Sequence, residues 1–471
     1  MRKNKVIFTI DYETWQPIPE GKDINWNRDL IAIPNELMDC FESVGVKLTF
    51  LVEICEIMYL EVTNPNIYEA IKTEIQSIIK RGHDVQLHMH PNWLPETGAS
   101  YIDGEWVWDE SLYAISDYPG DISELISRCK KKLEEIVSEV MPDYKVIAYR
   151  AGAYRIQPFK KIYRALVDND IELDTSVYRG GISIERKYNF VFCKSRNNPY
   201  KASIRDAQIS AKASKVVEYP IMTPSFGQRW IIDELYGKVF TKQFLNLSEL
   251  YFNNECNYFV AVGHSKGEHY YDEIRKNLEV LSRIPGIEFD TFSGIIKELR
   301  NDTIVNKSEL KICEVKSIME EISKKIVLVE ENSDRNIFSI LLSARASKGE
   351  AAKILYWMLK QYGYKVARIT VRAVCKSDKN TEHEEYVELT LNNKVYILDQ
   401  STNNIFEGTI DAKIDSFEVE NAVAYEYKRK YEKKMGYNSE TKIQAIIRSL
   451  NNVSEYYMPS FFHGRLKKIV K

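Results

Sequence analysis

The feature that most constrains the fold is an alternation, over residues 1–300, of short β-rich runs with stretches that have the pattern of helices. Strands that alternate with helices along a chain are usually parallel, with the helices as crossovers. The expected strands are Lys5–Ile10, Lys47–Val52, Asp84–His88, Lys145–Tyr149, Val216–Tyr219, Tyr258–Val262 and Ile287–Phe289. The expected helices are Asn35–Val44, Ile67–Lys80, Ile122–Met141, Pro158–Asn169, Thr241–Phe252, Tyr271–Arg283 and Ser293–Leu299. We therefore predict an α/β domain over residues 1–300, built as a barrel or an open sheet.

A second, smaller α+β domain is predicted over residues 313–423, after a polar linker at 300–312. Its expected elements are a helix over Lys348–Tyr362 and strands over Lys365–Val374, Glu384–Leu391 and Lys394–Leu398. The pair Asn392–Asn393 between the last two strands indicates a tight hairpin turn. We expect residues 424–471 to form a basic helical tail.

The charge distribution limits the classes of partner. The chain of 471 residues has 65 Lys and Arg against 68 Asp and Glu, a net charge of −3, which disfavours a nucleic-acid-binding protein. Residues 424–471 alone carry an excess of seven positive charges, so the rest of the chain carries −10. This tail is either a solvated helix face or a docking site for an acidic partner, an anionic glycan or lipid headgroups.

Cysteine usage and hydropathy bear on the cellular compartment. The seven cysteines are scattered and never in CxxC spacing, which is typical of reduced thiols and indicates a cytoplasmic protein. The apolar run Val6–Ile10 is too short for a signal peptide, and no run of 18 apolar residues predicts a membrane span.

Two pairs of polar side chains occur at the ends of expected strands. His88 and His90 are two residues apart, so they share one face of a strand and lie close enough to bind one metal ion. Asp11 and Glu13 share a face in the same way at the end of the first strand. Acidic residues are rare in strands, so two of them at one strand end call for an explanation. Taken alone, the carboxylates could be a solvated strand end.

Two further strand ends carry a polar group. Arg150 follows the apolar run VIAY, and His264 follows FVAV after a single glycine. Catalytic groups converge at the carboxyl ends of parallel strands. Arg150 could also be a buried ion-pair partner and His264 a core histidine, but four strand ends with such groups together favour a site.

The segments TIDYETW, VKLTFLVE, RGHDVQLHMHPNWL, YRAGAYRIQP, DTSV and VGHSKGEH occur in an order that resembles the motif series of the polysaccharide deacetylases, over about residues 5–300. The resemblance implies an irregular (β/α) barrel that binds a divalent metal, most often Zn²⁺. It also implies a metal-dependent hydrolase that removes the acetyl group from an N-acetylated sugar or a surface-glycan precursor.

The resemblance also implies roles for single residues. Asp11 matches the catalytic base, Arg150 the arginine that orients it, and His264 the general acid. Tyr12 stands where the family has a metal-binding Asp, and the second histidine of the metal motif falls on Asn92. The implied metal ligands are Glu13, His88 and His90, and the implied substrate contacts are Asn92, Trp93, Tyr154 and Asp174.

The segment 92–120 is long, rich in aromatic residues and expected to be an insertion near the site. Its Trp93, Trp106 and Trp108 either stack on sugar rings or form a small core beneath the loop. Two other functions stay open: a non-catalytic glycan-binding or scaffold protein, and a glycosidase that uses Asp11 and Glu13 as its carboxylates.

Residues 335–405 resemble, more weakly, a transglutaminase-like domain. The position of the family's nucleophilic cysteine falls on Lys348, Glu384 takes the place of the histidine with His383 one residue away, and Asp399 matches the aspartate. Without the thiol we expect this domain to bind a partner or a chain instead of cutting one. Ser347 is a poor substitute nucleophile.

Overall fold

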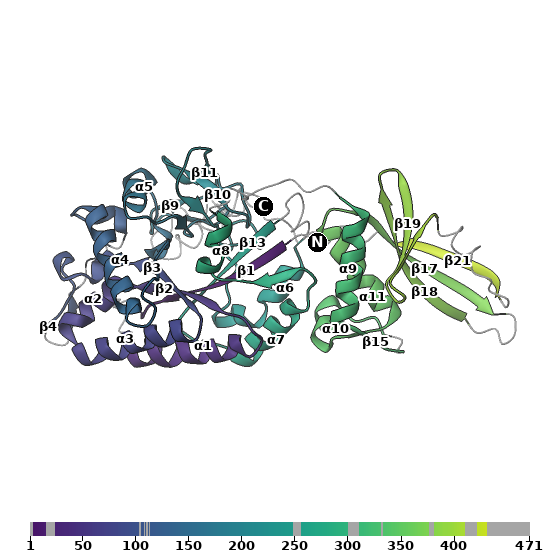
Figure 1. Cartoon of the computed structure of the whole chain (residues 1–471), viewed down its shortest axis with the longest axis horizontal. Helices are drawn as coiled ribbons and strands as arrows, with labels where there is room; N and C mark the ends of the chain where they lie inside the picture. Colours follow the sequence, from purple (N-terminus) through teal and green to yellow (C-terminus); the bar gives the residue numbers. More distant parts are fainter. Residues whose placement is uncertain are drawn as a thin grey trace, which may run out of the picture.

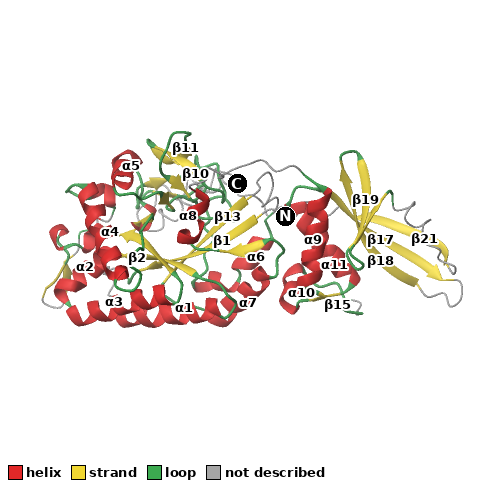
Figure 2. Ribbon diagram, viewed as in Figure 1, coloured by secondary structure: helices red, strands yellow, loops and turns green. Residues whose placement is uncertain are grey.

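The structure is a computed structural model that describes residues 3–15, 24–102, 105–107, 109, 112, 114–247, 256–299, 310–330, 333–375, 381–409 and 422–430. Two parts follow each other along the chain (Figures 1 and 2). The first has a curled sheet with helices outside it, and the second has three helices against a separate antiparallel sheet.

A ten-stranded mixed sheet forms the first part. Its strands are β1 (Lys3–Tyr12), β2 (Leu48–Glu53), β3 (Asp84–Met89), β6 (Ala148–Ala151), β7 (Leu173–Asp174), β10 (Tyr200–Ser203), β11 (Asp206–Ser210), β12 (Val217–Glu218), β13 (Cys256–His264) and β14 (Ile287–Phe289). The spatial order is β11-β10-β12-β7-β6-β3-β2-β1-β13, with β14 beside β1. All pairs from β12 to β13 are parallel, whereas β10 is antiparallel to both of its neighbours.

The sheet curls into an irregular half-barrel whose two ends are bridged by an extended segment. Ile221, just after β12, pairs with Val260 of β13, and Ile231 pairs with Val262. The strand that would close a regular barrel is thus replaced by two isolated bridges. This corrects the alternative of a fully open sheet and supports the expected irregular barrel.

Helices cover the outside of the half-barrel (Figure 1). They are α1 (Ile33–Glu42), α2 (Ile54–Thr63), α3 (Pro65–Lys80), α4 (Ile122–Ser138), α5 (Phe159–Asp168), α6 (Phe240–Leu245) and α7 (Tyr271–Ser282). Helix α8 (Phe292–Leu299) begins at the amino ends of β2 and β3, where the Ser293 N–H donates to Asp84. In α4, for example, buried Leu125, Ile126, Cys129 and Leu133 recur at helical spacing, and Asp121 caps its first turn. The amphipathic pattern therefore places one face of the helix on the sheet.

Three departures from the sequence prediction concern the first part. Helix α2 was not expected, because ICEIMYLEVT is apolar on all sides and has little periodicity. Segment 175–215 contains the short strands β8 (Ile182–Ser183) and β9 (Tyr188–Asn189) besides β10 and β11, which are too short for a clear pattern. The insertion at 92–120 contains the hairpin β4 (Ser100–Ile102) and β5 (Glu105–Val107).

The second part contains α9 (Ile312–Lys325), α10 (Ile337–Ser343), α11 (Lys348–Gln361), β15 (Val327–Leu328), β16 (Arg345–Ala346), β17 (Lys365–Cys375), β18 (Thr381–Leu391), β19 (Lys394–Asp399), β20 (Asn404–Glu407) and β21 (Ala422–Lys430). The five antiparallel strands are ordered β20-β19-β18-β17-β21, and α11 packs on β17 and β18. Asn392 and Asn393 have φ of 50° and 62°, as a type I′ hairpin requires.

The beginning of the basic tail differs from the prediction. Residues 424–430 belong to strand β21, whose sequence AVAYEYKRK alternates as a strand does, and not to a helix. The rest of the tail, 431–471, and most of the predicted linker lie outside the described residues.

The two parts share a continuous core of buried hydrophobic side chains. Helix α10 packs on α6 and α7, and Trp357 and Gln361 of α11 donate hydrogen bonds to the carbonyls of Leu245 and Leu247, at 3.1 and 2.9 Å. Arg283 of α7 donates to the carbonyl of Leu341 at the end of α10. Within the described ranges, no helix is long and apolar enough to cross a membrane.

Candidate metal and catalytic site

The carboxylates of Asp11 and Glu13 lie at the carboxyl end of β1, both buried. Tyr12 between them is buried on the opposite face, where its hydroxyl donates to the carbonyl of Leu30. The alternation of a strand therefore puts the two carboxylates on one side. Ser265, just after β13, fixes the backbone here because its hydroxyl accepts a hydrogen bond from the Glu13 N–H at 3.0 Å.

The imidazoles of His88 and His90 lie at the end of β3 and face Glu13. The Nε2 atom of His90 is 2.9 Å from Glu13 Oε2, and Nε2 of His88 is 3.5 Å from the same oxygen. The Nδ1 of His88 bonds to the carbonyl of Arg150 at 2.9 Å, which orients the ring with Nε2 toward the carboxylate. The two rings are 4.8 Å apart between centroids.

Glu13, His88 and His90 fit a divalent metal ion. One ligand atom from each lies within 4.8 Å of the others, and all three side chains are buried. Apart from these short contacts, neither Glu13 Oε2 nor His88 Nε2 takes part in a hydrogen bond of ordinary geometry among the described residues, although burial makes such a loss costly. Two imidazoles and one carboxylate are a donor set that Zn²⁺ and similar ions accept.

The protonation states of Glu13 and His90 are those in which both side chains bind a metal ion. Burial alone would raise the pKa of Glu13, but Lys266 and the two histidines lower it well below its usual value. Burial lowers the pKa of His90 to about 4, so its imidazole is neutral and able to bind a metal near pH 7. The Lys266 ammonium pairs with Glu13 Oε1 at 2.8 Å and leaves Oε2 to the histidines.

Asp11 is held by a buried arginine beside the cluster. Arg150, which is 0% exposed, places Nη1 2.5 Å from Asp11 Oδ1. Its other nitrogens donate to the hydroxyl of Thr9 at 2.9 Å and the carbonyl of Thr175 at 3.0 Å. Because these contacts fix the guanidinium on three sides, the position of the Asp11 carboxylate is set as well.

His264 lies on the other side of Asp11, directly opposite it in the β1–β13 register. Its Nε2 is 3.8 Å from Asp11 Oδ2, and its Nδ1 is 2.7 Å from Asp233 Oδ2. Burial would lower the pKa of His264, but the carboxylates of Asp233 and Asp11 raise it above its usual value. The ring is thus oriented by Asp233 and favoured in its protonated form.

Asn92 and Trp93, the two expected substrate contacts after β3, differ in whether their side chains already have partners in the protein. The amide of Asn92 is buried, and neither its oxygen nor its nitrogen has a hydrogen-bond partner among the described residues, so it is available to a ligand. Trp93 is 1% exposed and packs against Tyr59 of α2, with 5.9 Å between the rings. The ring therefore lies in the core, which is one of the two alternatives for this residue, and a contact of Trp93 with substrate stays a prediction. The side chains of Trp106 and Trp108 lie outside the described residues.

Tyr154 and Asp174 also occupy different places. Tyr154 lies in a turn after β6, with Ala153 and itself at positive φ of 46° and 62°. Asp174 is 0% exposed and accepts a hydrogen bond from Ser176, whose hydroxyl in turn accepts from the Ala151 N–H. Asp174 therefore supports the backbone behind the site, and its assignment as a substrate contact stays a prediction.

Three functional residues escaped the sequence prediction. Asp233 lies in an irregular segment, although it follows the apolar run WII as other site residues follow strands. Lys266 belongs to the GHSKGEH motif but has no role in the family pattern. A Cβ built on Gly152 would be 2.5 Å from His90 Nδ1, so only glycine leaves room for that ring.

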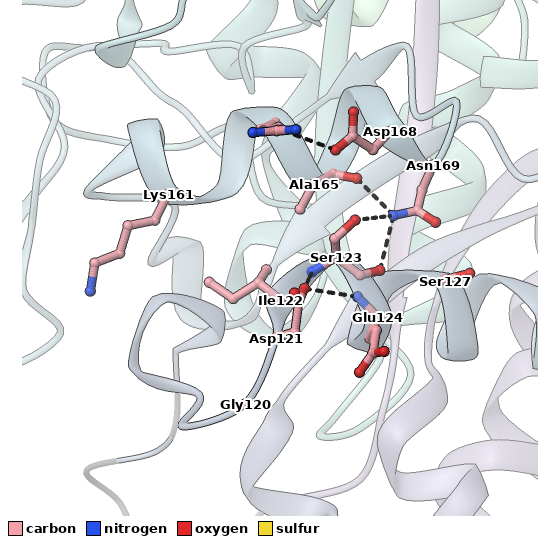
Figure 3. A pocket seen from close by; sticks show the side chains of 11 residues that line it. Gly120, Asp121, Ile122, Ser123, Glu124, Ser127, Lys161, Ala165, Asp168 and Asn169 are labelled. Atoms are coloured by element: carbon pink, nitrogen blue, oxygen red, sulfur yellow. Dashed lines mark hydrogen bonds and ion pairs between the residues drawn. The ribbon is translucent and has the colours of Figure 1, made fainter.

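His83, the first histidine of the segment GHDVQLHMH, and the cavity of the first part both lie away from the metal cluster. His83 lies at the opposite end of β3, where Nδ1 accepts from the Leu48 N–H at 2.9 Å and Nε2 contacts Glu42 at 3.0 Å. A cavity of about 830 Å³ lies between the start of α4 and the carboxyl-terminal half of α5 (Figure 3). Its dashed contacts include the capping of α4 by Asp121 and the bonds of the Asn169 amide to Ser123, and no residue of the metal cluster lines it.

In the second part, the position that corresponds to the cysteine of the transglutaminase-like pattern is Lys348, which has no thiol. Lys348 begins α11, and the hydroxyl of Ser347 caps this helix by accepting from the Glu350 N–H at 3.3 Å. Asp399 accepts hydrogen bonds from the backbone of Ser401 and Thr402. These side chains are used by the local structure.

No family model matches the chain, and no curated protein matches it. Among solved structures it is similar to PuuE allantoinase, with 11% identity, 64% of this chain and 91% of that chain covered, and a TM-score of 0.39. It is also similar to the Bc1960 peptidoglycan N-acetylglucosamine deacetylase, with 16% identity, coverage of 62% and 86%, and a TM-score of 0.29. A family 4 acetyl xylan esterase from Clostridium thermocellum shows 12% identity, coverage of 65% and 100%, and a TM-score of 0.27. At these identities and TM-scores the similarities carry no argument about this chain, and we argue the function from the geometry of the site.

Proposed function

We propose that this chain is a metal-dependent carbohydrate N-deacetylase, which hydrolyses the acetamide of an N-acetylated sugar or surface-glycan precursor in the cytoplasm. The observation that carries the proposal is the convergence of Glu13, His88 and His90 beside Asp11 and His264 at one edge of the half-barrel. The ordered motifs of the sequence support the same reaction.

An amide carbonyl is a poor electrophile, and its amine leaves only when protonated. A divalent ion held by Glu13, His88 and His90 would polarise the carbonyl oxygen and make a water molecule more acidic. The buried walls of the site strengthen such electrostatic effects, because few water molecules screen them.

The chain's own residues supply the proton transfers. Asp11, held by Arg150, takes the proton of the attacking water. His264, whose Nε2 lies on the other side of Asp11 at 3.8 Å, gives a proton to the departing amine. Asp233 holds Nδ1 of this histidine and stabilises its protonated ring. One group therefore acts as base and another as acid, and each has its own buried partner.

Acetate release tests this proposal. Purified protein supplied with Zn²⁺, Co²⁺ or Mn²⁺ is incubated with N-acetylglucosamine oligosaccharides and UDP-N-acetylglucosamine, and acetate and the free amine are measured by mass spectrometry. We expect stoichiometric acetate and amine in the wild type, and at least a hundredfold loss in Asp11→Asn. Absence of acetate from N-acetylated sugars in the metal-loaded wild type, or equal rates in Asp11→Asn, would contradict the proposal.

Measurements on the same purified protein distinguish two other functions from the deacetylase. Because the ion pair with Lys266 engages one oxygen of Glu13, a non-catalytic glycan-binding protein is the second candidate, and sugar binding by metal-free protein without acetate release would support it. A glycosidase is disfavoured because it would leave the buried imidazoles of His88 and His90 without a role, although the ligand atoms of Asp11 and Glu13 lie within 4.8 Å of each other. A retaining mechanism needs its carboxyl groups about 5–5.5 Å apart, on the two sides of a scissile bond.

A further inference from the structure

A partly buried arginine near the site has no acidic partner. The guanidinium carbon of Arg229 lies 4.5 Å from the ring centre of Tyr154 and 5.5 Å from that of Tyr178. No carboxylate among the described residues is within ion-pair distance of it. Contact with aromatic rings compensates only part of the cost of taking a cation out of water.

The aromatic rings beneath Arg229 are fixed. Tyr154 and Tyr178 contact each other edge to face at 5.8 Å, and both contact Tyr188, whose hydroxyl bonds to that of Tyr178 at 2.8 Å. Tyr188 stacks on Phe190 at 5.0 Å. The arginine therefore rests on a rigid platform and does not depend on a mobile loop for its position.

This platform is joined to the catalytic edge in two ways. Tyr154 is two residues from Gly152, the residue that touches the His90 ring, and its positive φ is a strained conformation of the kind found at functional sites. Arg229 belongs to the extended segment that pairs with β13 through Trp230 and ends at Asp233, the partner of His264.

The hydroxyl of Tyr154 completes the arrangement. The side chain is 5% exposed; its oxygen lies against the Arg229 guanidinium, and its O–H group has no acceptor among the described residues. A buried donor without a partner and a cation without a counter-ion at the same place are both satisfied by one negatively charged oxygen group.

We infer that Arg229 and Tyr154 bind an anionic group of the substrate, so that the sugar whose acetamide reacts is one that also carries a carboxylate or a phosphate. This inference rests on the proposed function, whose substrate class it narrows. A guanidinium presents N–H groups in a fork that matches either oxyanion, so the shared chemistry is a negatively charged group with two oxygens available.

Three N-acetylated probes distinguish the two sources of charge: neutral N-acetylglucosamine, N-acetylmuramic acid with its carboxylate, and UDP-N-acetylglucosamine with its diphosphate. We expect kcat/KM of the metal-loaded wild type to be about tenfold to a hundredfold higher for one anionic probe than for the neutral one, the range for one charge-assisted pair. In Arg229→Gln this ratio falls to about 1, and Arg229→Lys keeps part of it. Arg164→Gln, which changes a side chain 88% exposed, is the matched control and keeps the wild-type ratio.

Equilibrium binding of the same probes separates the two claims. If no probe releases acetate but an anionic probe binds the wild type at least tenfold more tightly than it binds Arg229→Gln, the deacetylase proposal fails and this inference stands. If probes are deacetylated with equal kcat/KM and Arg229→Gln leaves the ratio unchanged in a folded protein, the inference is overturned and the deacetylase stands. Equal affinities of the three probes without turnover would overturn both.

Discussion

Replacing Asp233 with asparagine is expected to move the alkaline limb of the activity profile to lower pH. Asp233 Oδ2 accepts two hydrogen bonds from His264, from the backbone N–H at 2.8 Å and from Nδ1 at 2.7 Å. Asparagine has nearly the same shape, so it keeps the space filled but removes the negative charge beside the ring.

The size of the effect follows from the geometry. A hydrogen bond to a charged group contributes about 1.5–3 kcal/mol, and one pKa unit corresponds to about 1.4 kcal/mol. The pKa of His264, which burial lowers and Asp233 raises above its usual value, should therefore fall in the variant, because this stabilisation of the protonated ring is lost. Because the protonated ring is the reactive form, activity is lost as pH rises through this pKa, and a lower pKa means loss at lower pH.

The assay is kcat/KM for acetate release between pH 5 and 9, in the metal-loaded wild type and in Asp233→Asn. Asp272→Asn is the control, since Asp272 is 86% exposed and its ion pair is with Arg275 on the surface of α7. We expect an unchanged profile in the control. An alkaline limb at the wild-type pH in Asp233→Asn, with normal folding and metal content, would refute the assignment of His264 as the acid.

Two further predictions concern metal binding and stability. Gly152→Ala should lower metal content at least tenfold while the protein stays folded, because the added Cβ lies 2.5 Å from His90 Nδ1; an unchanged metal content would contradict it. Burial lowers the pKa of His83 to about 4, so its neutral form stabilises the fold fully above pH 6.5 and this contribution, about 3 kcal/mol, is lost as pH falls toward 4. His83→Gln should therefore show a shallower decline of urea-unfolding free energy between pH 6.5 and 4.5; parallel declines would show that His83 does not titrate in this way.

The part of the site that lies on strands could be predicted from the sequence. A period of two alone puts Asp11 and Glu13, and likewise His88 and His90, on common faces, because successive side chains of a strand alternate. The parallel register then places Asp11 opposite His264, and His88 opposite Arg150. The sequence patterns predict which strand ends carry functional side chains, but they do not predict the register that pairs these residues.

Other parts could not be predicted, for physical reasons that differ from case to case. Asp233 reaches His264 from a segment that pairs with β13 only by two isolated bridges, so no strand periodicity marks it. The sequence left open whether Trp93 is buried, because helix α2, which packs against its ring, has no amphipathic pattern that would predict it. The role of Gly152 depends on a ring that is distant in sequence, and only the folded chain shows it.

Metal content tests the central claim most directly. Elemental analysis of the purified protein, after exchange into buffer treated to remove free metal and addition of one equivalent of Zn²⁺, is compared among wild type, His88→Ala and the surface control Asp272→Asn. The account predicts about one bound ion per chain in the wild type and the control, and less than about a tenth in His88→Ala. A wild type that retains no divalent metal, or a His88→Ala variant that retains the full equivalent, would contradict it.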